Sequence, residues 1–492
     1  MNIFHLICLA VLLHQKFISC QDVIHQLCVP IKPIIPSEIV DAVDDEANNS
    51  NNNVTPTNRS TSDNLYCECV MENSSQGGLL VMHIHCKNRK FKNENFAAEV
   101  LPTVTNSLDM SWNEFQFVPN FVGYDLSTLD MSHNAITVID DNNFAKVKNL
   151  SELNLSWNKI EALSINAFAR LGNLLKLDLS RNLLQKITNN VFSTMPSMTH
   201  LILSRNRFLN ETFSANDVDL YISLGVSTKL NILEIEDANL DTIDLLQGVG
   251  LKVVKLRCNK FELFPSIPRS IEILDLSENP LRTLEAKVIP HLNDLEEIYL
   301  NDMPRLSSIQ EYAFFGLPKL RIVSLEGSWK LTFFSGEAFG DYDVLNGSVT
   351  SLEVLNLRGT SLKYIDETLV TALDKIKKFD LNGNPLICNC DVRWIKDIGL
   401  ETNSRCYLPQ DLRGELLTEI SDSDLKCRRW SSWVYKTLNG LMILLLLILC
   451  GVATWLIVMG LRPSRRVHLQ KVGAASPYAR VTIEPNRADD LH

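Results

Sequence analysis

Apolar residues recur along the middle of the chain in a short pattern that returns, in most places, every 20 to 25 residues. Two clear copies are LSELNLSWNKI at residues 150–160 and LLKLDLSRNLL at residues 174–184. Inside each copy, apolar and polar residues alternate over a few positions, which is the period of a β-strand with one buried face. Each copy therefore predicts one short strand followed by a turn.

The apolar residue at the centre of each predicted strand marks twelve copies between residues 105 and 386. Two steps are longer, at 32 residues, and we interpret both as surface bulges. One copy cannot bury its apolar face alone, so the copies must stack to form a core. We therefore expect one curved domain, although length alone suggests two or three. The markers are Leu108, Leu129, Leu153, Leu177, Leu201, Leu233, Val254, Leu274, Ile298, Val323, Leu355 and Phe379.

The pattern, L-x-x-L-x-L-x-x-N-x-L, resembles the leucine-rich repeat. The resemblance implies an α/β repeat solenoid, a horseshoe with a parallel β-sheet on its concave side. The asparagine would turn the chain and bond the backbone of the neighbouring repeat. Ala238, Met303, Ser328 and Thr360 replace it in four later copies, so we expect local irregularity in the second half. The asparagines are Asn113, Asn134, Asn158, Asn182, Asn206, Asn259, Asn279 and Asn384.

Two apolar segments outside the repeats predict how the chain meets a membrane. Residues 1–20 contain an apolar stretch that ends near small residues, as in a cleaved signal peptide. Residues 440–461 carry no charge and are long enough to cross a bilayer, after a linker at 431–439. A cleaved signal places the repeats outside the cell and the basic tail, residues 462–492, inside. We expect a single-pass, type I plasma-membrane protein.

Cysteines flank the repeats on both sides. Residues 387–430 contain a C-x-C-x-x-x-W motif that resembles the C-terminal disulfide cap of extracellular members of the family. Residues 21–104 resemble the N-terminal cap, with an Asn-rich insertion at 48–64. The insertion is too polar to offset its ordering entropy, so we expect a flexible glycosylated loop, with a binding arm as the alternative. The family implies that Cys28 pairs with Cys69, Cys67 with Cys86, Cys388 with Cys406, and Cys390 with Cys427.

Zinc is an alternative reading of the N-terminal cysteines, because His83 and His85 lie near them in the sequence. Behind a signal peptide such cysteines are more often oxidised, and alternate histidines fit one face of a strand. We therefore expect neither a metal nor a cofactor. Cys258 is left over, which suggests either an intermolecular disulfide in a homodimer or a shielded thiol.

Eight N-x-S/T sequons predict surface positions for N-linked glycans. The one at Asn154 falls on the exposed side of a predicted strand, so a glycan there would obstruct a ligand at the third repeat. The two longer steps between markers each carry one sequon. The asparagines are Asn48, Asn53, Asn58, Asn73, Asn149, Asn154, Asn210 and Asn346.

Outward strand positions are small and nearly uniform in the early repeats and varied in repeats six to nine. Variety on a regular scaffold is what a specific contact surface needs, although neutral drift on a solvated surface produces it too. We therefore predict that repeats six to nine hold the main contact face. The candidate contact residues are Glu234, Glu236, Lys255, Arg257, Asp275 and Tyr299.

Catalysis and nucleic-acid binding are not indicated. The chain lacks a Gly-rich phosphate loop, H-E-x-x-H and G-x-S-x-G, so we expect no catalytic residues. The net charge of −11 argues against a nucleic-acid partner. In the tail, Tyr478-Ala-Arg-Val481 resembles a Y-x-x-Φ sorting signal for an endocytic adaptor, and Tyr478 could instead be phosphorylated.

Two functions fit this organisation. In the first, the solenoid serves cell adhesion or cell recognition by binding a protein ligand or counter-receptor on the extracellular side. In the second, it is a co-receptor or ligand trap that regulates a signalling pathway through binding and endocytosis. The short tail fits both, because neither needs an enzymatic output.

Overall fold

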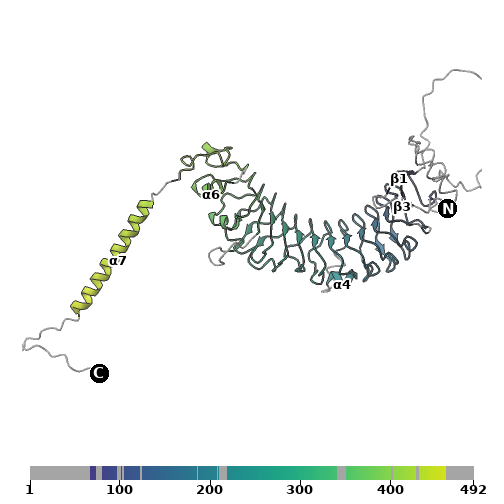
Figure 1. Ribbon diagram of the computed structural model, residues 1–492, viewed down its shortest axis with the longest axis horizontal. Helices are drawn as coiled ribbons and strands as arrows, with labels where there is room; N and C mark the ends of the chain where they lie inside the picture. The colour runs from purple at the N-terminus through teal and green to yellow at the C-terminus, as the bar shows by residue number, and fades with distance from the viewer. Residues whose placement is uncertain are drawn as a thin grey trace, which may run out of the picture. The chain divides into compact units, whose positions relative to one another are not determined.

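The computed structural model describes residues 67–73, 80–96, 101, 105–121, 123, 125–185, 187–207, 209, 219–340, 351–399, 403–427 and 432–460. The chain divides into two units, residues 1–425 and 426–492, and each is described by itself. The first is a curved solenoid built around one long β-sheet (Figure 1). Residues 1–20, Cys28 and the predicted glycosylation sites Asn48, Asn53, Asn58, Asn210 and Asn346 lie outside the described residues, as do Tyr478 and Val481.

The long sheet has 14 strands, of which β3 onward are parallel and each contribute one strand per repeat. Every marker residue of the sequence lies at the middle of a strand, or one residue from its end in β3, and pairs with the marker of the next repeat. The predicted parallel solenoid is confirmed. The strands are β3 (Thr105–Asp109), β4 (Thr128–Asp130), β6 (Glu152–Asn154), β8 (Lys176–Asp178), β9 (His200–Ile202), β10 (Ile232–Glu234), β11 (Val253–Lys255), β12 (Ile273–Asp275), β14 (Glu297–Tyr299), β16 (Ile322–Ser324), β18 (Val354–Asn356) and β19 (Lys378–Asp380).

Each repeat turns through an asparagine whose side chain is buried. In the third repeat, the Asn158 side-chain amide donates to the carbonyls of Leu155 and Met131, both at 3.0 Å, and its oxygen accepts from the N–H of Ile136. Met131 and Ile136 belong to the preceding repeat, so one side chain ties two repeats together. The residue just before the asparagine position has positive φ in all twelve repeats, and in the last three it is glycine.

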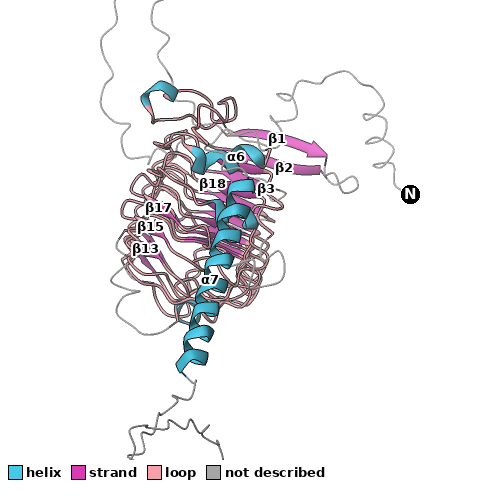
Figure 2. Ribbon diagram, turned by 90° about the vertical axis from the view of Figure 1, so that its left-hand side faces the viewer, coloured by secondary structure: helices cyan, strands magenta, loops and turns pink. Residues whose placement is uncertain are grey.

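The convex side is closed by stacked phenylalanines and short sheets. Phe144, Phe168 and Phe192 are fully buried, with ring centroids 6.2 and 6.0 Å apart along the stack. Each ring packs against the ring of the neighbouring repeat. A single repeat has no such neighbour and therefore cannot form a core alone. Short strands pair here, away from the long sheet (Figure 2). They are β5 (Val138–Ile139) with β7 (Ala162–Leu163), and β13 (Thr283–Leu284) with β15 (Ser308–Ile309) and β17 (Phe333–Phe334).

The irregularity expected in the second half is absent from the long sheet, whose register continues unshifted from β9 to β19. The replacements fill the asparagine site in two ways. Ala238 and Met303 are fully buried apolar side chains, whereas the hydroxyls of Ser328 and Thr360 donate to nearby carbonyls. Within the first long step, the structure describes a single helical turn, α4 (Leu220–Leu224), capped by Asp219.

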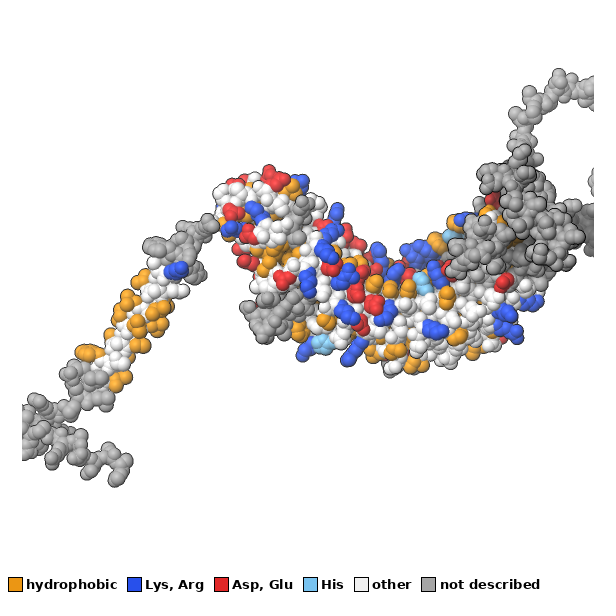
Figure 3. All heavy atoms as spheres, in the orientation of Figure 1, with side chains coloured by type: hydrophobic (Ala, Val, Ile, Leu, Met, Phe, Trp, Pro, Cys, Tyr) orange, Lys and Arg blue, Asp and Glu red, His pale blue; other side chains and the backbone are white. Residues whose placement is uncertain are grey.

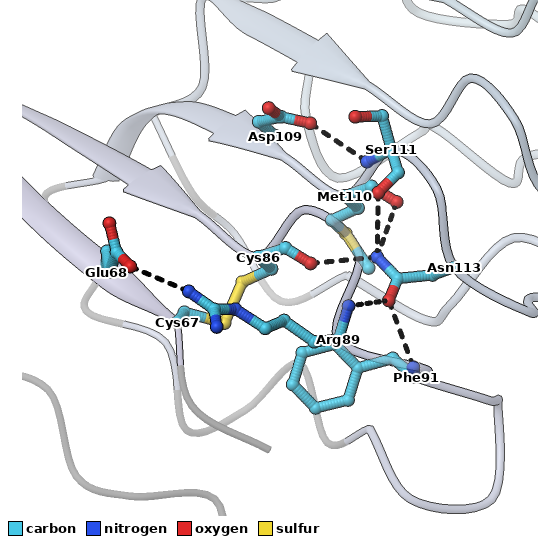
Figure 4. Close-up of a disulfide and its surroundings, with 9 residues drawn as sticks. All are labelled: Cys67, Glu68, Cys86, Arg89, Phe91, Asp109, Met110, Ser111 and Asn113. Carbon is cyan, nitrogen blue, oxygen red and sulfur yellow. Dashed lines mark hydrogen bonds and ion pairs between the residues drawn. A yellow bond between two sulfur atoms is a disulfide. The ribbon is translucent and has the colours of Figure 1, made fainter. Parts of the chain in front are cut away.

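Both ends of the sheet carry disulfides. At the N-terminal end, β1 (Glu68–Asn73) pairs antiparallel with β2 (Leu80–His85), and β2 adds parallel to β3. A disulfide joins Cys67 to Cys86 at this end (Figure 4). The side-chain amide of Asn113 donates to the carbonyl of Cys86, so the asparagine network begins at this cap.

At the C-terminal end, a disulfide joins Cys388 to Cys406, and Trp394 packs on Phe379 of the last repeat, 6.3 Å between rings. Cys69, Cys390 and Cys427 are also disulfide-bonded. These contacts cover the last apolar layer of the stack. The helices of this end are η2 (Glu367–Ala372), η3 (Cys390–Val392), α6 (Arg393–Asp397) and η4 (Gln410–Leu412).

Among its described residues, the second unit contains one helix, α7 (Ser432–Gly460). Its stretch Lys436–Ile457 is long and apolar enough to cross a membrane, and none of it is buried. An apolar helix without a protein partner among the described residues fits a lipid environment better than water.

Candidate functional site

The concave sheet exposes two chemically different regions. In each repeat, the strand residue after the marker faces outward, and the positive-φ residue stands at the edge of the sheet. Parallel pairing lines up equivalent residues of successive repeats into rows. Acidic and basic side chains lie interspersed along this inner side of the solenoid (Figure 3).

Repeats one to four carry a stack of exposed rings at the edge of the sheet, here called the aromatic ladder: Trp112, His133 and Trp157, followed by Arg181. The centroids of Trp112 and His133 are 3.9 Å apart, and those of His133 and Trp157 are 4.8 Å apart. The Arg181 guanidinium lies 4.0 Å from the centre of the Trp157 ring. Trp112 is nevertheless 52% exposed and Trp157 is 47% exposed.

The surroundings of His133 in the ladder disfavour its protonation. Partial burial between the two indoles lowers the pKa of His133, and the positive charges of Lys87 and Arg181 lower it further. Asp130 opposes this shift. A neutral imidazole stacks between two indoles without bringing a charge into the stack.

A row of carboxylates runs parallel to the ladder, here called the acidic column: Asp109, Asp130 and Asp178, with Asn154 in the third repeat. One oxygen of each aspartate accepts the backbone N–H two residues on, at 2.8 to 2.9 Å. Asn154 makes the same contact at 3.0 Å and donates to Asp130. These local bonds fix where the side chains lie but leave their charge uncompensated.

A row of small serines separates the column from the ladder. Ser111, Ser132 and Ser156 are buried, at 3 to 5% exposure, and Ser180 follows them in the fourth repeat. The column itself borders a hollow of about 230 Å³, lined by strand residues of the first four repeats. Neither the serines nor the rings of the ladder line this hollow, so it lies at the acidic column and not between the column and the ladder.

The candidate residues of repeats six to nine are brought together as predicted by the strand register: Glu234, Lys255, Asp275 and Tyr299 are successive neighbours. We call these four residues, with Glu236 and Arg257, the mixed-charge region. Its charges largely satisfy one another. The Glu234 carboxylate is 3.1 Å from both His200 and Lys255, with a side chain only 17% exposed.

Two further side chains of the mixed-charge region have partners, whereas Glu236 and Asp275 form no ion pair among the described residues, and Asp275 accepts the Ser277 N–H as the aspartates of the acidic column do. Arg257 is ion-paired with Glu278, and the Tyr299 hydroxyl donates to Glu297 at 2.7 Å. Burial, with the nearby Glu297 charge, raises the pKa of Tyr299 to about 12.

The pKa values of the two glutamates of this region, Glu234 and Glu236, are shifted in opposite directions. The hydrogen bond from His200 lowers the pKa of Glu234 against the effect of burial, and Lys255 adds to the lowering. Burial raises the pKa of Glu236, and the charges of Glu234 and Asp275 raise it further. Glu236 therefore carries the least favourable negative charge of the region.

Cys258 occupies the positive-φ position of the seventh repeat, and its thiol is exposed and free. Burial, with the charges of Asp237 and Glu278, raises the pKa of the thiol, which slows its oxidation. His83 and His85 alternate along β2, and no group of three metal-ligand side chains occurs in the described part of the chain. Asn149, one of the predicted glycan sites, is exposed and donates to Asp125.

The aromatic ladder was missed by sequence reasoning. Its residues stand just before Asn113, Asn134, Asn158 and Asn182. Reading that position down successive repeats gives Trp, His, Trp and Arg, a signal that was present but not used.

Comparison with known proteins agrees with the geometry. Residues 106–160 and 148–208 match the sequence family described as leucine rich repeat. The repeats within residues 106–208 are leucine-rich repeats. This matched part contains the aromatic ladder and the acidic column, and folds of this kind are typically binding scaffolds rather than enzymes.

Several known proteins are similar in sequence to part of this chain. Trophoblast glycoprotein of Macaca fascicularis is 25% identical over 222 residues, covering 36% of this chain and 52% of that protein. Thyrotropin receptor of Mus musculus is 23% identical over 132 residues, 27% of this chain and 16% of that one. The chain thus spans about half or less of these relatives. The structure of an internalin from Listeria monocytogenes is 18% identical with a TM-score of 0.44, covering 65% of this chain and 85% of that one.

Proposed function

We propose that this protein is a cell-surface protein-binding molecule that uses its leucine-rich-repeat solenoid for cell adhesion or cell recognition. The observation that carries the proposal is the concave sheet. It presents aromatic and charged side chains from consecutive strands on one surface, in a chain that also contains a helix able to span a membrane. The partner is a protein ligand or counter-receptor outside the cell.

Exposed aromatic residues support a role in protein contacts. Two indoles about half exposed leave apolar surface in water, which a monomer without a partner has no reason to keep. Trp and Arg are also the residues that contribute most to binding at protein interfaces. Their position on rigid strands and turns lowers the ordering cost of binding.

The proposed function implies a type I, single-pass arrangement in the plasma membrane, with the predicted caps and sequons outside the cell. A tag inserted after residue 20 should be stained on intact cells, and a tag after residue 492 only after permeabilisation. Staining of the C-terminal tag on intact cells would contradict this arrangement.

Mixing labelled cells that express the full chain with unlabelled cells that do not tests the adhesive role. Sorting of expressing cells into aggregates of their own supports homophilic adhesion, and mixed aggregates support a counter-receptor on the other cells. A non-reducing gel of the same cells tests the homodimer through Cys258, because Cys258→Ser should then abolish the dimer band. Absence of any aggregation removes the adhesion proposal.

The second candidate is a co-receptor or ligand trap that is removed from the surface by endocytosis. It is favoured by the Tyr478-Ala-Arg-Val481 sequence in the tail. Replacing Tyr478 with alanine should slow internalisation of surface-labelled protein, whereas Tyr478→Phe separates phosphorylation from adaptor binding. An internalisation rate unchanged by Tyr478→Ala would remove the sorting role of Tyr478 and Val481.

A further inference from the structure

We propose that Arg181, at the end of the aromatic ladder, binds a carboxylate of an acidic segment of the partner protein. In the same complex, the exposed rings of the ladder receive an apolar side chain of that segment. This inference rests on the proposed protein-binding function and specifies the chemistry of the partner. Three features support it: a guanidinium without an ion pair, the positive charges around it, and fixed aromatic rings beside it.

The Arg181 guanidinium is held in place but not neutralised. It lies 4.0 Å from the centre of the Trp157 ring, which in turn stacks on His133 at 4.8 Å. Within the described part of the chain, the Arg181 side chain forms no ion pair and no hydrogen bond. A guanidinium has five N–H donors in a planar fork, and this fork can bind one carboxylate through two parallel hydrogen bonds. Arg181 therefore offers a preformed site for a carboxylate.

Asp178, the acidic residue on the strand of the same repeat, does not occupy this fork. One oxygen of its carboxylate accepts the backbone N–H of Ser180 at 2.8 Å, and it forms no ion pair with Arg181. The two side chains belong to different rows, because Asp178 lies on the strand and Arg181 at the edge of the sheet. No carboxylate of the described residues lies in direct contact with the guanidinium, so the site is open to a partner.

The arginines of the next repeat share a single carboxylate. Both oxygens of Asp237 accept from Arg207, at 3.1 and 2.9 Å, and Arg205 lies 4.0 Å from the same carboxylate. Burial lowers the pKa of Arg181, and the charge of Arg205 lowers it further, whereas Asp237 opposes the shift. The surroundings of Arg181 thus disfavour its positive charge, and a bound carboxylate would stabilise that charge.

The ladder adds fixed apolar surface beside this charge. Trp112 is 52% exposed and Trp157 is 47% exposed, although their rings stack on His133 at 3.9 and 4.8 Å. Stacking holds the rings in one orientation, so binding does not have to order them. Successive strands of a sheet are about 4.8 Å apart, so the ladder and Arg181 form a row along which a partner segment can lie. An acidic residue at Arg181 and an apolar residue at the rings would then contact the row together.

The later repeats do not offer the same site on their paired arginines. Arg257 is ion-paired with Glu278, and Arg321 with Glu296. An incoming carboxylate would have to displace these partners, at the cost of their hydrogen bonds. The chemistry therefore assigns the acidic segment to Arg181 and the ladder.

A sulfated glycan is the other anionic partner that arginines could bind. Such a chain would use the charges of Arg181, Arg205 and Arg207 without needing the ladder. The faces of His133 and Trp157 are already covered by stacking, so a sugar ring cannot lie flat on them. The exposed ring edges therefore favour a protein segment with apolar side chains over a glycan.

The test uses the full-length protein on the cell surface and a fluorescent peptide of alternating glutamate and leucine. The peptide should bind, and binding should weaken as salt rises. Two changes should each reduce its affinity at least about tenfold at matched surface amounts: Arg181→Gln, and Trp112→Ala together with Trp157→Ala. Arg181→Lys should recover only part of the affinity, because an ammonium keeps the charge but lacks the planar fork.

Matched controls exist elsewhere on the solenoid. Arg269 is exposed and forms no ion pair among the described residues, so Arg269→Gln is the charge control. Trp329 is 60% exposed and has the Lys330 ammonium 4.9 Å from its ring centre, outside the ladder, so Trp329→Ala is the aromatic control. Both control variants should bind the peptide as the parent protein does.

Several outcomes would overturn the proposal. They are absence of binding at peptide concentrations up to about 1 mM, equal losses in the control variants, or equal binding of a glutamate–serine peptide, which lacks apolar side chains. Binding of a heparin fragment in place of the peptide, lost in Arg181→Gln, would assign the site to a sulfated glycan instead. The adhesion proposal is tested separately by cell mixing. Cells that aggregate without binding the peptide would refute this site alone, whereas peptide binding without aggregation would refute adhesion alone.

Discussion

Repeats one to four and repeats six to nine share one backbone but treat charge in opposite ways. In the first region, the aspartates of the acidic column form no ion pair within the described part of the chain, and the ladder beside them is exposed. In the second, Glu234 and Arg257 each have a partner in a neighbouring repeat, and only Asp275 and Glu236 lack one among the described residues. The number of charged side chains on a face is thus a poor guide to binding, because charges that satisfy one another have less to offer a ligand.

The difference between the two regions also bears on the use of residue variety to locate a contact face. Varied residues in repeats six to nine suggested the main contact face, and that assignment stays a prediction. Their variety has a second explanation in the structure, because unlike side chains are what cross-strand pairs require. The uniform serines of repeats one to four are instead buried between the acidic column and the ladder.

The largest expected effect comes from reversing Glu234, Lys255 and Asp275 together. The change disrupts internal ion pairs and inverts the charges that a partner would meet, so cell aggregation should fall at least about tenfold at matched surface amounts. The exchange Glu234→Lys with Lys255→Glu is the control, since it keeps one internal pair. Unchanged aggregation in the triple variant would remove the mixed-charge region as a contact surface.

A smaller effect is expected on the free energy of unfolding, when the ion-paired carboxylate of Glu234 and the unpaired carboxylate of Asp178 are each replaced by an amide. Glu234→Gln should lower the free energy of unfolding by about 1–2 kcal/mol, because hydrogen bonds to His200 and Lys255 lose their charge assistance. Asp178→Asn should change it by less than about 0.5 kcal/mol. Thermal unfolding of the full-length protein in detergent measures both, and equal changes would contradict the comparison.

The same glutamate predicts a pH dependence of stability. Its pKa is lower in the folded than in the unfolded protein, so its contribution is present above the unfolded value and is lost as pH falls through the folded value. The stability difference between the parent protein and Glu234→Gln should therefore shrink in acid. A difference that grew as pH fell would show that the carboxylate is not stabilised by His200 and Lys255.

The free energy of unfolding should fall slightly as pH drops and His133 becomes protonated, because the folded protein binds that proton less readily than the unfolded chain does. The pKa of His133 lies below its ordinary value because of burial, with Lys87 and Arg181 lowering it further and Asp130 opposing them. The contribution of His133 to stability should be full at neutral pH and decline below the ordinary histidine range of about 6.5. His133→Gln should remove the decline, and a decline that persists in this variant would assign it to another group.

The smallest expected effect concerns the predicted glycan at Asn154. Ser156→Ala removes the sequon but keeps the asparagine, whose side chain bonds Asp130 and the Ser156 N–H. A glycan there would project from the concave sheet, so cells with the variant should aggregate up to about threefold more at matched surface amounts. Glycopeptide mass spectrometry of the parent protein checks the premise, and an unmodified Asn154 would remove it.

Much of the fold could be predicted from the sequence because each repeat is recognisable from a short stretch of residues. The alternation around Leu153 and Leu177 places a strand and its buried face, and Asn158 and Asn182 place the turn after each. The candidate site was less predictable. Glu234 and Lys255 could be placed in one row, but their mutual pairing depends on side-chain directions that spacing does not contain.

What the sequence determined alone was therefore the solenoid: its strands, its parallel register and the positions that face outward. These features depend on backbone periodicity and on apolar burial, and both can be recognised within the sequence of each single repeat. Only the tertiary structure decided which outward charges are neutralised and which remain available. Trp112 and Trp157 lie 45 residues apart in the chain, and stacking of successive repeats brings them onto either side of His133 as one exposed surface.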